Sequence, residues 1–175
     1  VYYDTSSGGP YSESEANEGT SPITLPLESL ADINNPEFTI SGLKDNQNYY
    51  FTVTAYNNEN PYLESDYSNE VSILMPESTI GTPVSDLTIN VGDTVHFTGT
   101  GNDPNDDIPF TYLWHFGTGS GIGDYTADDD PGDVTFENVG VFTVTFTVTD
   151  AMGGSDPTPA TQVITVLETL NPEIE

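Results

Sequence analysis

The chain has no cysteine and only one basic residue, Lys44, against 29 acidic residues. Without cysteine it forms neither disulfides nor thiolate nucleophiles. Phosphate backbones are bound by Lys and Arg, so a formal net charge of -28 excludes nucleic acid as a partner. The same charge is repelled by anionic lipid surfaces.

Long apolar runs are also missing. No stretch approaches the roughly 20 residues that a membrane-spanning helix needs, so we expect no membrane insertion. No basic and apolar secretion leader opens the sequence, and we expect the leader of a secreted protein to lie upstream of Val1. Histidine is scarce, and His96 and His115 lack the paired spacing of zinc sites, which sets zinc aside.

The acidic excess has two explanations that the sequence leaves open. A chain of this charge repels itself unless salt or divalent ions screen it. One explanation is adaptation to a saline setting, in which the carboxylates are solvated. The other is a specific dependence on calcium, a hard cation that takes carboxylate oxygens as ligands.

Alternating residue patterns predict an all-β protein. The clearest run is VFTVTFTVTD, residues 141–150, and a second is YYFTVTAY, residues 49–56. In each, apolar residues recur with period two, as in a half-buried antiparallel strand. The inward sets are Phe142, Val144, Phe146 and Val148 in the first run, and Tyr49, Phe51, Val53 and Ala55 in the second. Short strands separated by Gly, Pro, Asn and Asp clusters predict two tandem Ig-like antiparallel β-sandwiches.

A change of composition marks a domain boundary. Residues 75–83 read MPESTIGTP, in which two prolines and a glycine interrupt the strand pattern. The predicted organisation is a first module, a linker, a second module and the start of a further linker, over residues 1–76, 77–83, 84–168 and 169–175. Each module is long enough to bury a small β core.

The first module carries a family motif, GLKDNQNYYFTVTAY, at residues 42–56. It resembles the fibronectin type III consensus, in which a leucine precedes a tyrosine by six positions and alternating apolar residues follow. Leu43 and Tyr49 fit this spacing. The resemblance implies that Tyr49 is a tyrosine corner, whose hydroxyl bonds back to the backbone near the preceding turn.

The first two strands of that family have no counterpart in residues 1–76. We expect them either upstream of Val1 or from a neighbouring subunit that adds a strand by β-augmentation. Without them, one sheet face loses its cover and a strand edge is left open. We therefore expect Tyr49, Phe51 and Val53 to be uncovered by the rest of this chain.

The second module carries two ordered motifs, WHFGTG at residues 114–119 and GVFTVTFTVTD at residues 140–150. Together they resemble the PKD domain, an Ig-like module with a W-D-F-G-D-G run and a G-x-Y-x-V-x-L-x-V-x-D strand. The resemblance covers about residues 84–166. His115 and Thr118 depart from it, because the family usually carries aspartates there.

The PKD resemblance assigns Trp114 to the core. It implies that Trp114 lies between the two sheets, with Tyr112 and Phe116 on its side of the strand. His115 then points to the opposite side, towards solvent. It has no nearby nucleophile or second histidine, so we expect no catalytic role for it.

The stretch GNDPNDDIPFTYLW crowds three aspartates ahead of that tryptophan. Asp103, Asn105 and Asp107 alternate like the first ligands of an EF-hand. However, Ile108 replaces the turn glycine and Trp114 stands where the bidentate glutamate belongs, which excludes an EF-hand.

The PKD resemblance implies a different calcium site. Some PKD-like domains bind calcium near the loop between strands B and C and the end of strand F. The candidate ligands are Asp103, Asp106, Asp107 and Asp150, and oxygen ligands suit a hard cation. Calcium is thus the only cofactor that we expect, and a solvated turn is the alternative. A second acidic loop, residues 124–133, has no ligand spacing and is expected to be solvated.

No catalytic constellation is present in the sequence. The glycine-rich run GTGSGIG, residues 117–123, fits neither a phosphate-binding loop nor a nucleophile elbow. We therefore expect that the chain is not an enzyme.

Tyrosines are concentrated in the first module, which holds eight of the ten. Exposed tyrosines stack on sugars or anchor protein interfaces. Those that an incomplete sandwich cannot all bury are Tyr2, Tyr3, Tyr11, Tyr50, Tyr56, Tyr62 and Tyr67. The expected partners are other domains or subunits of a surface assembly, with carbohydrate as an alternative.

These features favour a non-catalytic structural or adhesive segment of a larger prokaryotic protein at the cell surface or outside the cell. A filament, a sheath and an adhesin stalk all fit. The alternative is an accessory module of a secreted glycosidase or peptidase, which the fold alone does not separate from the first reading.

Overall fold

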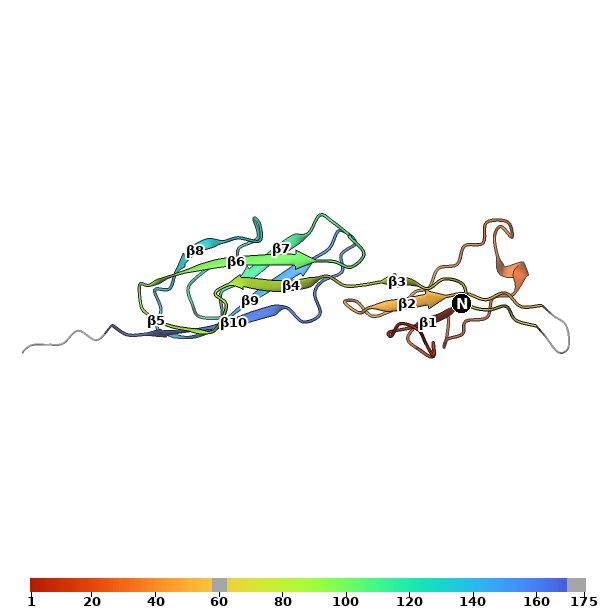
Figure 1. The fold of residues 1–175 in the computed structure, drawn as a ribbon, viewed down its shortest axis with the longest axis horizontal. Helices are drawn as coiled ribbons and strands as arrows, with labels where there is room; N and C mark the ends of the chain where they lie inside the picture. The colour runs from red at the N-terminus through yellow and green to blue at the C-terminus, as the bar shows by residue number, and fades with distance from the viewer. Residues whose placement is uncertain (58–62, 170–175) are drawn as a thin grey trace, which may run out of the picture. The chain divides into compact units, whose positions relative to one another are not determined.

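The computed structural model describes residues 1–57 and 63–169, which belong to two compact units, Val1–Leu74 and Met75–Glu175 (Figure 1). The described residues contain ten β-strands, one short 3-10 helix η1 (Leu27–Ser29) and no α-helix, so the all-β prediction is confirmed. No described helix has the length and apolarity to cross a membrane. Tyr62 and residues 170–175 of the expected second linker lie outside the described residues.

The second unit is a sandwich of two sheets. One sheet has the strand order β5-β10-β9-β7 and the other β4-β6-β8. Their strands are β4 (Glu77–Thr82), β5 (Leu87–Asn90), β6 (Thr94–Asn102), β7 (Thr111–His115), β8 (Gly132–Thr135), β9 (Gly140–Thr149) and β10 (Ala160–Leu167). Only the β5–β10 pairing is parallel among these described strands.

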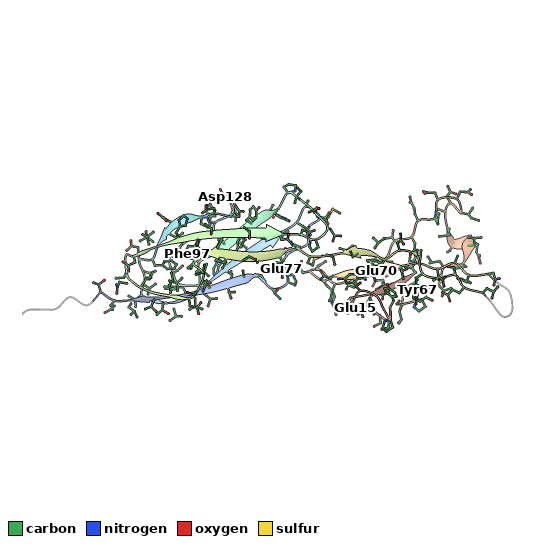
Figure 2. The ribbon with its side chains drawn as sticks, in the orientation of Figure 1. Glu15, Tyr67, Glu70, Glu77, Phe97 and Asp128 are labelled. Carbon is green, nitrogen blue, oxygen red and sulfur yellow. The ribbon has the colours of Figure 1, made fainter. Side chains whose placement is uncertain are left out.

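Strand β9 supplies the centre of the core, as its sequence predicts. The four residues expected to face inward are at most 4% exposed, namely Phe142, Val144, Phe146 and Val148. Val141, of the opposite parity, is 69% exposed. Across the sandwich these side chains share one core cluster with Val95 and Phe97 of β6, and Phe97 is labelled in Figure 2. Period-two alternation of an extended chain is enough to produce this division.

Two glycines of β6 allow the sheets to approach each other closely. A Cβ atom on Gly99 would lie 2.5 Å from the ring of Phe146, and one on Gly101 would lie 2.8 Å from the side chain of Val148. Both distances are shorter than any ordinary contact. The large side chains of β9 therefore occupy the space that side chains on β6 would otherwise fill.

Residues 77–83, which we expected to be a linker, are for the most part a β-strand of the second unit. Residues 77–82 form β4, which pairs with β6 from Glu77 opposite Asn102 to Thr82 opposite Thr98. Pro76 and Pro83 stand just outside the strand, where a missing N–H removes no bond of the ladder. The prolines that suggest a linker in the sequence instead bound an edge strand.

A buried polar cluster holds β4 in place. The carboxylate of Asp156, which is 4% exposed, accepts hydrogen bonds from the backbone N–H groups of Ser78 and Thr158, both at 2.7 Å, and from the Ser78 hydroxyl. The Ala160 N–H in turn donates to the Ser78 hydroxyl oxygen at 2.9 Å. These bonds join β4 to the start of β10 and leave the buried charge satisfied.

In its described residues, the first unit contains one antiparallel sheet of order β1-β2-β3. Its strands are β1 (Tyr2–Asp4), β2 (Tyr49–Thr52) and β3 (Val71–Ile73). Irregular backbone between β1 and β2 covers part of one face. The small core consists of Tyr3, Ala16, Ile23 and Tyr49, with Leu25, Ile40, Leu43 and Phe51 packed around it.

The tyrosine corner is confirmed by its hydrogen bonds. The Tyr49 hydroxyl accepts a bond from the backbone N–H of Lys44 at 3.0 Å and donates to the Glu15 carboxylate at 2.7 Å. Glu15 also forms an ion pair with Lys44. The only lysine of the chain is thereby held at the turn that precedes β2.

The expectation that Tyr49 lacks cover is wrong. Its side chain is 2% exposed and Phe51 is half-buried, because Ile23 and its neighbours pack on this end of β2. These core residues do not cover the strand beyond Phe51, and Val53 is 47% exposed, as expected. On the same face of β3, Val71 is 65% exposed. Regular pairing of β2 also ends at Thr52 rather than continuing to residue 56.

Candidate functional site

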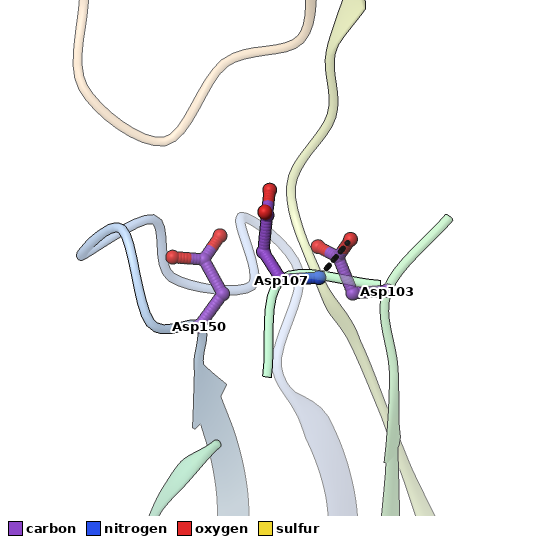
Figure 3. A group of neighbouring side chains, drawn as sticks. All are labelled: Asp103, Asp107 and Asp150. Carbon is purple, nitrogen blue, oxygen red and sulfur yellow. Dashed lines mark hydrogen bonds between the residues drawn. The ribbon is translucent and has the colours of Figure 1, made fainter. Parts of the chain in front are cut away.

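Two loops at one end of the second unit bring acidic residues together. The loop after β6 begins at Asp103, and the turn after β9 begins at Asp150. The backbone N–H of Ala151 donates to the carbonyl of Asp107 at 3.0 Å and joins the two loops. Figure 3 shows the side chains of Asp103, Asp107 and Asp150 side by side between these loops.

Asp103 is the most constrained member of this group. Its Oδ1 atom accepts hydrogen bonds from the backbone N–H of Asn105 at 2.6 Å and of Asp107 at 3.4 Å, which folds the loop back over it. The residue is only 5% exposed. Its Oδ2 atom is buried and has no hydrogen-bond partner. A buried polar atom without a partner is rare and calls for a ligand or a compensating group.

Asp150 is held in a similar way. Its Oδ1 atom accepts bonds from the N–H groups of Met152 and Gly154, both at 2.8 Å, and the residue is 6% exposed. A Cβ atom on Gly154 would lie 2.7 Å from the Oδ2 atom of Asp150, so glycine makes room for this carboxylate. Both buried aspartates therefore use one oxygen to order their own turn.

The geometry of the three carboxylates fits a calcium ion. Asp103, Asp107 and Asp150 each offer an oxygen, and these oxygens lie within 4.8 Å of one another. Calcium binds oxygens at about 2.3–2.6 Å, so two of its ligands lie at most roughly 5 Å apart. Lys44, the only basic side chain, pairs with Glu15 in the first unit. Two buried carboxylates beside the half-buried Asp107 are costly without a cation, and a divalent ion would offset that cost.

Asp106 does not belong to this group. The structure brings together three of the four predicted ligands and leaves the Asp106 side chain exposed. Its backbone has a φ of 59° and forms the tight turn of the loop, a conformation that aspartate tolerates better than most residues. The sequence alone does not distinguish this turn residue from a ligand, and calcium binding stays a prediction.

Trp114 and His115 lie as their alternation predicts. Trp114 is fully buried and stacks on Phe146, with ring centroids 4.4 Å apart. The His115 side chain is 44% exposed, and its Nδ1 atom lies 2.8 Å from a carboxylate oxygen of Asp124. His96 makes a comparable surface pair with Asp133.

The second acidic loop is shaped by its own carboxylates. Asp128 accepts bonds from the Tyr125 hydroxyl and the Asp130 N–H, and Asp130 accepts one from the Gly132 N–H. The bond to Asp128 raises the pKa of the Tyr125 phenol. These carboxylates act as turn caps.

The two antiparallel sheets of the second unit define an Ig-like β-sandwich module. Comparison with protein families identifies it further. Residues 79–166, just over half of the chain, match the PKD domain, and the chain belongs to that family. PKD domains are typical accessory modules of extracellular proteins.

Among solved structures, the chain is similar to the fibronectin(III)-like modules of Clostridium thermocellum CbhA. The two share 18% sequence identity with a TM-score of 0.42. The match covers 74% of this chain and 66% of that chain, which is just under two thirds of it. No curated protein matches the chain.

Proposed function

We propose that this chain is a non-catalytic structural segment of a larger extracellular surface protein, in which the PKD domain is a rigid spacer stabilised by calcium. The observation that carries this proposal is the unpartnered Oδ2 atom of Asp103, buried beside Asp107 and Asp150. A cation at this point would link the loop after β6 to the turn after β9. A spacer benefits from such a link because loops are otherwise the least stable parts of a sandwich.

Charge supports an environment in which divalent ions are plentiful. The acidic excess destabilises the compact state unless ions screen or bind it. Extracellular calcium sites typically bind with dissociation constants of about 0.1–1 mM, which suits weak sites built from few carboxylates. The chain would then be stiff where calcium is present and looser where it is not.

The calcium site is tested by direct titration. Isothermal titration of the chain with calcium chloride is expected to show one saturable site, which magnesium fills more weakly because it demands a smaller octahedral shell. Asp103→Asn should abolish the site, since it removes one charge and the free oxygen. The matched control is Asp106→Asn, in the same loop but outside the group, which should bind as the parent does. Loss of binding in both variants, or in neither, would refute the assignment.

The non-catalytic role predicts that the chain has no hydrolase activity of its own. Its surface histidines pair only with carboxylates, and it has no cysteine. The measurement is release of reducing ends or free amines from polysaccharide and peptide substrates. Turnover above the buffer level that disappears in His115→Ala would overturn the prediction, with His96→Ala as the matched surface control.

A further inference from the structure

Three tyrosines of the first unit form a cluster outside its core. Tyr2 lies in β1, Tyr11 follows that strand, and Tyr67 precedes β3. Their ring centroids are 5.0 Å apart for Tyr2 and Tyr67, 5.4 Å for Tyr11 and Tyr67, and 6.4 Å for Tyr2 and Tyr11. All three pairs meet edge to face. Tyr67 remains 55% exposed, so the cluster is part of the surface.

Two glutamates fix the orientation of the rings. The Tyr2 hydroxyl donates to Glu64 and the Tyr11 hydroxyl donates to Glu70, both at 2.6 Å. These bonds raise the pKa of both phenols to about 12. A phenol that donates to a carboxylate has a more electron-rich ring, which strengthens its attraction for a cation.

The glutamates are themselves held by further donors. Glu70 accepts bonds from the Gly8 N–H at 2.8 Å and from the Ser7 hydroxyl at 2.6 Å, and Glu64 accepts one from the Thr54 hydroxyl at 2.6 Å. These donors hold the pKa of each carboxyl below its usual range, so both are ionised at neutral pH. The cluster thus presents two ordered negative charges beside three ordered rings, and Figure 2 labels Tyr67 and Glu70 within it.

A surface hollow opens beside the cluster. Its lining consists of Tyr2, Thr54, Glu64, Ser65, Asp66 and Tyr67. It therefore combines two aromatic rings with two carboxylates, and no described lysine, arginine or histidine lines it. The Val1 amino group attracts Glu64 from a distance but donates its own hydrogen bond to the Ile23 carbonyl.

We propose that this hollow binds a basic side chain, above all arginine, presented by a partner protein. A guanidinium stacks on aromatic faces and bonds carboxylates in one plane, so it uses both kinds of group in the lining. Because hydrogen bonds already order the Tyr2 ring and the Glu64 carboxylate, binding costs less conformational entropy at this surface.

The partner is a different protein rather than a second copy of this chain. The chain contains no arginine, and its single lysine is paired with Glu15. Two copies would bring together surfaces of strong negative charge, which repel each other. A partner with a basic patch is instead attracted over a distance and then held by the specific contacts of the hollow.

The charge of the lining favours a cation over a neutral sugar. Glu64 and Asp66 lie beside Tyr2 and Tyr67, and no described lysine, arginine or histidine lines the hollow. Aromatic rings beside carboxylates attract positive charge, which a neutral sugar lacks.

The test is a nuclear magnetic resonance titration of the whole chain at about 0.15 M salt, where long-range attraction is largely screened. The probe is the peptide Gly-Arg-Gly-Arg-Gly, and its control is the same peptide with neutral citrulline in place of arginine. We expect saturable shifts of Tyr2 and Tyr67 signals with the arginine peptide only. The proposal does not depend on calcium, so the titration is done in chelator and its failure would leave the calcium assignment intact.

Variants separate the hollow from general charge attraction. Tyr67→Leu should raise the dissociation constant of the arginine peptide at least about threefold, which is the scale of one exposed cation–π contact. We expect the same change in Glu64→Gln. The matched controls are Phe38→Leu and Glu28→Gln, exposed positions of the first unit that do not line the hollow, and both should bind the peptide as the parent does. Unchanged Tyr49 signals would show that the variants are folded. Equal weakening in variants and controls, equal binding of the citrulline peptide, or shifts of the same tyrosines by neutral oligosaccharides instead of the peptide would each overturn the proposal.

Discussion

Trp114→Ala is expected to lower the free energy of unfolding of the PKD domain by about 3–5 kcal/mol, the usual cost of truncating a large buried aromatic residue. The indole is fully buried and contacts Phe97, Phe116 and Phe146, with centroid distances from 4.4 to 6.3 Å. Removing it leaves a cavity between the two sheets, and the surrounding rings, attached to paired strands, close that cavity only in part. The measurement is urea unfolding followed through amide signals of the second unit.

Trp114→Phe is the matched control for this truncation. The Trp114 Nε1–H group is buried without a hydrogen-bond partner, so replacing the indole by a benzene ring also removes an unsatisfied donor. The phenylalanine ring keeps most of the stacking on Phe146. We expect a cost below about 1.5 kcal/mol, near the upper limit for tolerated apolar exchanges. An alanine variant no less stable than the phenylalanine variant would contradict the assignment of Trp114 to core packing.

Calcium is expected to raise the stability of the same domain by about 2.7 kcal/mol when its concentration is one hundred times the dissociation constant. The ion would bind only the folded state, because Asp103 and Asp150 belong to loops that only folding brings together. The measurement is thermal unfolding of the second unit in calcium, magnesium and chelator at matched ionic strength. Calcium should stabilise more than magnesium, and identical curves in all three would rule the site out.

Asp103→Asn distinguishes a metal ligand from a residue that only shapes the loop. The amide keeps an oxygen that accepts the bonds now made to Asn105 and Asp107, and its NH2 group can donate to the neighbouring carboxylates. We therefore expect stability in chelator equal to or above that of the parent, and no response to calcium. Lower stability in chelator together with a normal calcium response would mean that Asp103 has a structural role only. Asp106→Asn should respond to calcium like the parent.

Much of the PKD domain could be predicted from local patterns. The alternation in residues 141–150 identifies the buried face of β9, and the parity of Trp114 and His115 places one inside and the other outside. These features are local, since successive side chains of any extended strand point to opposite faces. The spacing of Leu43 and Tyr49 likewise predicts a bond within a single turn, which the Lys44 N–H makes.

Contacts between distant segments could not be predicted in this way. Asp103, Asp106 and Asp107 are equivalent in the sequence, yet the turn at Asp106 directs its side chain to solvent while the other two meet Asp150. In the sequence, the prolines on either side of β4 are equally compatible with a linker. The pairing of β4 with β6 shows which backbone N–H groups the sheet uses, and the prolines lie outside that strand. Cover of Tyr49 by Ile23 also depends on how an irregular segment folds back over the sheet.

The all-β class, the PKD family and the inward faces of the strands follow from the amino-acid sequence, because periodicity and motif spacing act over a few residues. The folded chain is needed to show which carboxylates share a site and which tyrosines gather around Glu64 and Glu70. Those groups come from segments about 40 to 60 residues apart. Their meeting is set by sheet pairing and loop closure, whose free energies depend on the whole fold rather than on any one segment.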